Sequence, residues 1–432
     1  MRARAALVVA SLMLSLVAGT VAAQVPAAAP RGAPELTFGA YLAAVARANL
    51  TLAAQRANVS VADAQITIAR VFPDPVLTAG VGSWEVSGVG AQNSATAGVS
   101  VPVEWPTKRP ARIAAARAGR DVAAADLEDV ARTLRGAATA AWIDAIFAQR
   151  TAERRRTTAE SMERLAEANA QRVRDGALGE MVALQTRIEA ARYRGEALTA
   201  DGEVRATRAA LDELMGARGA TADTAVHGEL RVEPRTFTLE ALVAYAAEHR
   251  ADLRARREGV RAARARVDLA QANRGIDVSA NLGWQYSTPG QQGSAFEAPG
   301  FHSLGATLSV PLPLSRIYDG EVRAARASEE QSLLLRDAAD LRATTEIREA
   351  LARYDAARAR LGTFDASLLA DNDRVLEMAR YAFEHGASRL LELLLAQRTW
   401  AETTLAYEAA LADHARALAA LETAAALWDL AF

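Results

Sequence analysis

The chain of 432 residues contains no cysteine. Disulfide bonds, thiolate metal ligands and catalytic thiols are therefore excluded, and so is a lipid anchor attached to a cysteine. Aromatic residues make up only 5% of the chain, and so few rings cannot fill the thick core of a large globular domain. The many alanines favour helices that pack closely side by side.

Residues that carry chemistry are also scarce. The five histidines include no pair spaced by three or four residues, so the usual helical pair of metal ligands is missing. No serine–histidine–aspartate set or carboxylate pair has the spacing of an active site. We therefore expect no catalytic residues, no resident metal and no cofactor, and hence no enzyme. The net charge of −2 is too balanced to predict nucleic acid as a partner.

Long apolar runs are confined to the N-terminus. Two arginines within the first four residues precede the apolar run Ala5–Val17, and small residues precede Gln24. This pattern predicts a secretory signal peptide over residues 1–23, followed by a linker over 24–35. The alternative is a retained anchor helix, but the run is shorter than the roughly 20 apolar residues that a bilayer requires. No later stretch resembles a transmembrane helix, so an exported protein of this sequence would have to enter a membrane with strands.

Proline is rare, and its distribution marks long helices. All 13 prolines lie outside two stretches of 65 residues each, Ala111–Asp175 and Glu321–His385. Proline disrupts a helix interior, and a continuous helix of this length would measure roughly 100 Å. Apolar residues recur at spacings of three and four in both stretches, which predicts a seam that must pack against partner helices.

The two long stretches belong to an internal duplication. The segment Val99–Val103 (VSVPV) recurs as Leu308–Leu312 (LSVPL), in the same order of predicted elements. The duplication places a first repeat at 36–216, a linker at 217–236 and a second repeat at 237–432. Each repeat is a helix–hairpin–helix–helix module.

Helix lengths within each repeat predict how the module packs. The opening helices are expected at Phe38–Arg70 and Thr238–Ala272, and the returning helices at Ala177–Met215 and Ala387–Leu430. One opening and one returning helix together are about as long as the long helix between them. We therefore expect the long helix to run from the strands to a distant tip, with the returning and opening helices covering successive parts of it.

Each repeat also contains two short segments of alternating character. The predicted strands cover residues 76–86, 94–103, 276–286 and 303–312. One face of most strands is apolar and the other is small and polar, which is typical of a barrel with lipid outside and water inside. The predicted lipid-facing residues are Ile276, Val278, Leu282, Trp284, Leu304, Leu308 and Val310. The faces of the first strand are left unassigned, because its residues alternate poorly.

The strand pattern has a second interpretation, a half-buried hairpin that packs on a soluble core. If the strands do enter a membrane, four are too few, because a membrane barrel needs at least about eight and open sheet edges are not tolerated in lipid. Copies of the chain must then join to close the barrel.

Several motifs carry a resemblance to a known family. They are Phe72–Leu77 (FPDPVL), Val103–Arg112 (VEWPTKRPAR), His249–Leu253 (HRADL), Gly176–Glu180 (GALGE) and Gly386–Ser388 (GAS). In this order on a duplicated frame, they resemble the TolC-type outer membrane efflux proteins, and within them the cation-efflux branch that includes CzcC and CusC. The resemblance covers nearly the whole chain after the signal peptide.

The resemblance implies a mainly helical fold with a small β part. Three copies would close a barrel of twelve strands, and their helices would form a tunnel across the periplasm. It further implies a passive exit duct in the outer membrane that meets a periplasmic adaptor and an inner-membrane pump of the RND type. Metal cations are the expected cargo. Export of drugs or small molecules and type I secretion by the same fold stay open, as does a soluble periplasmic coiled-coil scaffold without a barrel.

The resemblance also points to the helix reversals as functional sites. Gly176 and Gly386 are expected to end helices in a left-handed conformation, and the tips they form are candidates for adaptor contact. The tip candidates are Gly176, Ala177, Leu178, Gly386 and Ala387, and the candidates for the tunnel mouth or gate are Glu392, Ser388, Arg389 and Glu180. Glu392 could equally be a solvated or ion-paired surface residue. Leu395 is apolar where relatives can carry a second acidic residue, so a ring of two acids per copy is not expected.

Overall fold

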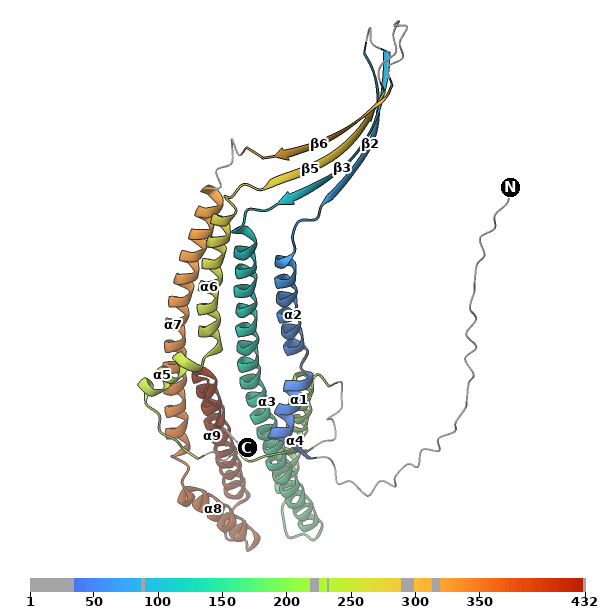
Figure 1. Ribbon diagram of the computed structural model, residues 1–432. Helices are drawn as coiled ribbons and strands as arrows, with labels where there is room; N and C mark the ends of the chain where they lie inside the picture. Colours follow the sequence, from blue (N-terminus) through green and yellow to red (C-terminus); the bar gives the residue numbers. More distant parts are fainter. Residues whose placement is uncertain are drawn as a thin grey trace, which may run out of the picture. The chain divides into compact units, whose positions relative to one another are not determined.

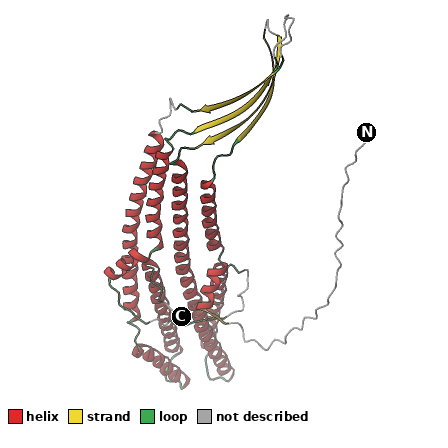
Figure 2. Ribbon diagram, in the orientation of Figure 1, coloured by secondary structure: helices red, strands yellow, loops and turns green. Residues whose placement is uncertain are grey.

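The computed structural model describes residues 35–86, 90–217, 225–230, 233–288, 299–312 and 319–429. The predicted signal peptide and nearly all of the linker at 24–35 lie outside these residues. The elements in chain order are β1 (Glu35–Thr37), α1 (Phe38–Ala48), α2 (Leu50–Arg70), β2 (Val76–Val86), β3 (Gly90–Val103), α3 (Lys108–Arg174), α4 (Glu180–Leu214), β4 (Ala225–His227), α5 (Leu239–His249), α6 (Ala251–Ala272), β5 (Val278–Ser287), β6 (Phe301–Ser309), α7 (Asp319–Leu361), α8 (Ala366–Glu384) and α9 (Leu390–Ala425). Helices therefore dominate, and the four longer strands gather at one end of the helices (Figure 2).

The sheet and the helices next to it share one order. The antiparallel sheet has the strand order β2-β3-β5-β6. The helices α2, α3 and α6 are joined by short connections to β2, β3 and β5, and α7 follows β6 in the chain. Each of these helices packs against the next in the same sequence (Figure 1). The duplicated hairpins thus form one continuous layer, with β2 and α2 at one edge and β6 and α7 at the other.

The first of the two long helices predicted from the proline-free stretches is confirmed. α3 continues without interruption for 67 residues. α2 packs beside the part of α3 near the sheet, and α4 packs beside the part near the tip (Figure 1). Successive partners therefore cover the alanine-rich seam of α3.

The prediction of a second uninterrupted helix is wrong. α7 ends at Leu361 and α8 begins at Ala366. Thr363 donates its hydroxyl to the carbonyl of Arg360 at 2.7 Å, and the Asp365 carboxylate accepts the amide N–H of Leu368 at 2.7 Å. These bonds end one helix and cap the next, so an absence of proline does not guarantee continuity.

The two opening helices are also interrupted, at Asn49 and Arg250, whose backbones are both extended. The Asn49 side chain donates to the carbonyl of Leu214 at 2.9 Å. The Arg250 guanidinium donates to the carbonyl of Ala424 at 2.8 Å. Both acceptors lie in the last turn of a returning helix, so the two repeats make equivalent joints with different side chains.

A second, small sheet is formed by strands that were not predicted from the sequence. β1 pairs in parallel with β4, with Leu36 opposite Val226. β4 falls inside the segment predicted to be a linker at 217–236. Three-residue strands carry too little alternation to be found from sequence alone.

The largest apolar cluster joins both repeats. Trp142 of α3 is fully buried and stacks on Tyr41 of α1, with 5.2 Å between ring centroids. A second cluster is centred on Tyr354 of α7, whose ring lies 5.3 Å from that of His414 of α9. Few aromatic residues are thus concentrated where several helices meet.

His414 makes the stability of the helices dependent on pH. Burial first and the nearby Arg358 charge second lower the pKa of His414 below 6.5, and neither ring nitrogen has a hydrogen-bond partner among the described residues. The unfolded chain therefore binds the proton more tightly, and the contribution to stability is present above about pH 6.5 and lost as the pH falls below it. We expect the melting temperature to fall as the pH is lowered from 8 to 5.5.

The variant His414→Phe tests this dependence. Phenylalanine fills the same apolar site without a titrating group, so the fall in melting temperature from pH 8 to pH 5.5 should be smaller than in the unsubstituted protein. An identical fall in both proteins, followed by circular dichroism, would assign the pH effect to other residues.

Candidate functional site

The sheet places side chains of opposite character on its two faces. Val99 of β3 lies between Leu77 of β2 and Leu282 of β5 in the strand register. Side chains alternate along a strand, so partners in register share a face. The apolar face consists of Leu77, Ala79, Val81, Ala95, Ala97, Val99, Val101, Val278, Ala280, Leu282, Trp284, Tyr286, Leu304, Ala306 and Leu308, together with His302. Leu282 is 62% exposed and Leu304 is 80% exposed, so this face is apolar without being covered by other parts of the described chain.

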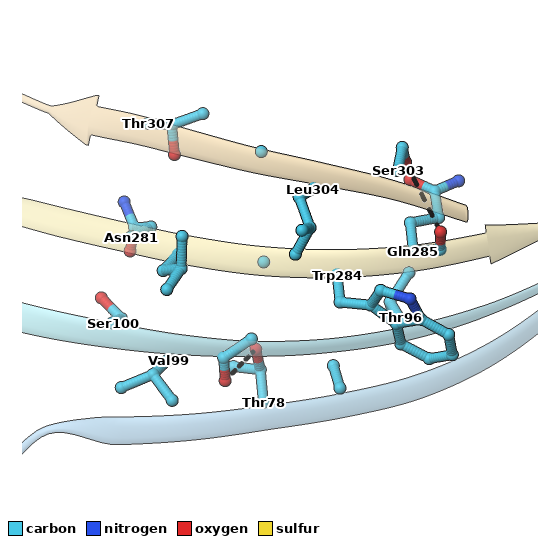
Figure 3. Close-up of a pocket in the computed structure, with 15 residues that line it drawn as sticks. Thr78, Thr96, Val99, Ser100, Asn281, Trp284, Gln285, Ser303, Leu304 and Thr307 are labelled. Carbon is cyan, nitrogen blue, oxygen red and sulfur yellow. Dashed lines mark hydrogen bonds between the residues drawn. The ribbon is translucent and has the colours of Figure 1, made fainter.

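The opposite face is small, polar and uncharged over the middle of the sheet. Gly98, Gly283 and Gly305 are consecutive partners across three strands, and the residues on either side of this row carry hydroxyl or amide groups. They are Thr96, Gln285 and Ser303 on one side and Ser100, Asn281 and Thr307 on the other (Figure 3). A hollow of about 510 Å³ lies at this part of the sheet, and it is lined by these side chains together with Val99, Trp284 and Leu304 (Figure 3). The small, polar face suits contact with water and polar cargo.

The strand register determines the two faces of the first strand, which the sequence left unassigned. Leu77, Ala79 and Val81 lie on the apolar face. Two residues predicted to face lipid from within strands do not lie in strands, because β5 begins at Val278, after Ile276, and β6 ends at Ser309, before Val310. Ile276 lies between α6 and β5, and Val310 follows the last residue of β6.

The two helix tips have the same geometry. Gly176 and Gly386 both have a φ of +71°. The amide N–H of Ala177 donates to the carbonyl of Arg172 at 2.8 Å, and that of Ala387 donates to the carbonyl of Ala382 at 2.8 Å. These are the hydrogen bonds of a Schellman motif. An added Cβ at either glycine would meet no atom within 4 Å, so the left-handed backbone, rather than crowding, requires glycine there.

The candidate gate residues begin the returning helices. Glu180 is the first residue of α4, and Glu392 lies in the first turn of α9. A carboxylate in the first turn is stabilised by the helix dipole. Neither forms an ion pair within the described part of the chain. Ser388 places its hydroxyl in a buried position without a hydrogen-bond partner among described residues, and Arg389 precedes α9 with an extended backbone.

Exposed apolar side chains follow both tips in the chain, and the sequence analysis did not identify them as a candidate surface. Met181, Leu184 and Ile188 are exposed along α4, and Leu391 and Leu395 are exposed along α9. Their spacings of three and four place each set on one side of its helix. The same spacing in the sequence could have identified them, but it resembled the seams that hold the helices together.

Within the described residues, no group of three or more histidine, aspartate or glutamate side chains is arranged to hold a metal ion. No helix of the described chain is both long enough and apolar enough to cross a bilayer.

Comparisons with known proteins agree with these surfaces. The family described as "Outer membrane efflux protein" matches residues 42–217 and 242–427. The chain is 25% identical to the cobalt-zinc-cadmium resistance protein CzcC of Cupriavidus metallidurans over 374 residues, which cover 86% of this chain and 85% of CzcC. It is 29% identical to protein CyaE of Bordetella pertussis, covering 80% of this chain and 74% of CyaE.

The fold is also that of a solved channel. The crystal structure of CusC superimposes with a TM-score of 0.72 at 16% identity, covering 91% of this chain and 92% of CusC. The family model matches the chain in two separate segments of similar length. The chain therefore belongs to the outer membrane efflux protein family, and it is the outer membrane channel of a tripartite efflux pump, a passive duct that extends into the periplasm and catalyses no reaction.

Proposed function

We propose that three copies of the chain form the channel, that the channel exports metal cations, and that its helix tips dock onto a periplasmic adaptor served by an RND-type pump. The observation that carries the proposal is the sheet itself. Over the described residues it has four strands, two unpaired edges, one exposed apolar face and one polar face.

The edges of the layer support assembly from several copies. Among the described strands, β2 and β6 each have one edge without a partner, and such edges are not tolerated in lipid. Three copies supply twelve strands, which is enough to close a barrel. The helices below carry matching stripes, because Val61 and Ile68 are exposed on α2 and Leu334 and Leu341 are exposed on α7. Each pair is spaced by seven residues, as in a helix-packing seam, so α2 of one copy would pack against α7 of the next.

The tips support adaptor docking. Gly176, Ala177, Gly386 and Ala387 are all exposed, and the two reversals share one hydrogen-bonding pattern. Three copies would present six similar tips. The half-buried Leu178 and the exposed apolar residues that follow it would give an adaptor helix an apolar surface, with Arg389 beside it.

The cation cargo rests on charge at the mouth. Glu180 and Glu392 have no ion-pair partner among the described residues, and three copies of each around an axis would concentrate cations by their negative potential. The name of the relative CzcC refers to cobalt, zinc and cadmium. A duct for drugs or for secreted proteins would share the sheet and the tips but would not need this charge.

The cargo can be tested in cells that lack the channel. Restoring the chain should lower the intracellular content of zinc, cobalt or cadmium, measured by mass spectrometry after a metal load. If the restored chain lowers the accumulation of an apolar dye but of none of these metals, the cargo is a small molecule and the cation proposal is wrong.

A point variant tests the charge at the mouth. We expect Glu392→Ala to raise single-channel conductance or leakiness, because three smaller side chains widen the mouth. It should also weaken the preference for K⁺ over Cl⁻, because three carboxylates leave the mouth. The control is Glu240→Ala, which removes an exposed carboxylate from the first turn of α5, far along the chain from either tip. Unchanged conductance and selectivity in Glu392→Ala would remove Glu392 from the mouth.

A further inference from the structure

Trp105 lies at the end of the sheet nearest the helices, in a cradle formed by Gly275, Asp277 and Lys108. The backbone N–H of Trp105 donates to the Asp277 carboxylate at 2.8 Å. The Lys108 ammonium donates to the other oxygen of the same carboxylate at 2.7 Å. The indole ring lies over Gly275, where an added Cβ would be 2.4 Å from it. Two chain segments therefore fix the position of one ring.

The ring continues the apolar face of the sheet. Val101, Val103 and Trp105 are exposed, whereas Pro102 and Glu104 between them are less exposed. The Glu104 side chain is directed to Arg112, with which it forms a salt bridge of 2.7 Å. The alternation of the strand therefore persists past its last paired residue and places Trp105 on the same side as Val103.

A second aromatic level marks the other end of the same face. The His302 ring lies 5.5 Å from that of Trp284 and 4.9 Å from that of Tyr286. Tyr286 is the register partner of Ala95 on β3, so Trp105 lies ten residues further along the chain, two residues after β3 ends. Residues on this face between the two levels are aliphatic.

The separation of the two levels matches a membrane. Ten residues of strand extend about 33 Å, and at the usual strand tilt of about 40° they span about 25 Å along the membrane normal. The apolar band of an outer membrane barrel is about 25 Å tall and is bounded by aromatic residues. Tryptophan is favoured at such boundaries because its ring is apolar and its N–H is polar, and no hydrogen bond of the Trp105 indole N–H is formed within the described chain.

We propose that Trp105 anchors the channel at the periplasmic boundary of the outer membrane, with its indole ring among the glycerol and carbonyl groups of inner-leaflet phospholipids. The inference rests on the proposed function, because it requires the apolar face to contact lipid. It adds the depth at which the sheet sits and the cradle of Gly275, Asp277 and Lys108 that sets this depth.

The absence of cysteine permits single-site labelling of the whole trimeric channel. A fluorophore is attached to Val103→Cys, and in a second protein to Leu282→Cys, in vesicles of phosphatidylethanolamine and phosphatidylglycerol. Quenchers are lipids with a nitroxide at the headgroup, lipids with a nitroxide deep in the acyl chain, and iodide in water. We expect the headgroup nitroxide to quench the label at 103 most strongly and the deep nitroxide to quench the label at 282 most strongly.

Two variants then disturb the anchor without touching the labelled site. Trp105→Ser removes the ring, and Gly275→Ala displaces it, so both should shift the quenching at position 103 away from the headgroup nitroxide. Gly305→Ala is the matched control, because an added Cβ there meets no atom within 4 Å. It should leave the profile unchanged.

The outcomes separate the inference from the proposed function. A label at 103 that only iodide quenches, with the label at 282 still reached by the deep nitroxide, overturns the anchor and leaves the channel intact. A profile at 103 that neither Trp105→Ser nor Gly275→Ala alters also overturns it. If iodide alone quenches both labels, the apolar face does not contact lipid and the proposed function fails as well.

Discussion

Replacing Leu282 with arginine should prevent stable assembly of the channel in the outer membrane. Leu282 lies near the middle of the apolar face and is 62% exposed. An arginine on the lipid face at the bilayer midplane costs about 2–4 kcal/mol, and a trimer carries the substitution three times. Most of the protein should therefore be lost from the outer membrane fraction, measured by immunoblot after fractionation.

The neighbouring position supplies the control. Asn281 lies on the polar face, between Ser100 and Thr307 in the register. Asn281→Arg should assemble normally, because water can solvate the charge there. Leu308→Arg and Thr307→Arg form a second pair with the same expected contrast. Equal tolerance of arginine at all four positions would show that the faces are assigned wrongly.

Removing the arginine of the second joint should have the largest effect on the helical part. The Arg250 side chain is only 2% exposed and forms salt bridges of 2.7 Å with Asp252 and 2.8 Å with Glu346. Arg250→Met leaves Asp252, whose side chain is 25% exposed, without this partner, while Glu346 keeps its salt bridge to Arg342. The cost should therefore lie above the roughly 1 kcal/mol of an exposed pair and below the roughly 3–5 kcal/mol of a fully buried one. It also leaves the carbonyl of Ala424 without its donor. The midpoint of denaturant unfolding should fall accordingly, as followed by helical circular dichroism.

A surface arginine provides the comparison. Arg353 on α7 is 75% exposed and pairs with Glu349. Arg353→Met should change the free energy of unfolding by less than about 1 kcal/mol, since exposed pairs contribute little. A similar, small loss of stability in both variants would mean that the Arg250 joint does not hold the helices together.

Much of the architecture could be predicted because it depends on repetition. The duplicated VSVPV and LSVPL segments, the proline-free stretches and the glycines at 176 and 386 each report a feature that many residues share. Such features determine the order of elements and the mainly helical class with a small sheet, which the comparisons confirm. Family membership also decides between the channel and the soluble scaffold.

Features that depend on single contacts could not be predicted. Asn49 and Arg250 break the opening helices because each side chain reaches a carbonyl more than 160 residues away in the sequence. The faces of β2 follow from its pairing with β3 rather than from its own composition. The apolar side chains beside the tips have helical spacing, but only the structure shows that no part of the described chain covers them.

The trimer in the membrane is tested most directly by crosslinking its edges in cells. Because the chain has no native cysteine, one cysteine can be placed on β2 and one on β6, and the pair scanned along both strands. From the variants with both cysteines, we predict disulfide-linked products of two and three copies in the outer membrane fraction, and no larger species. Variants with only one of the two cysteines should give no product larger than two copies. A processed protein that remains a single copy in solution without detergent would contradict the account.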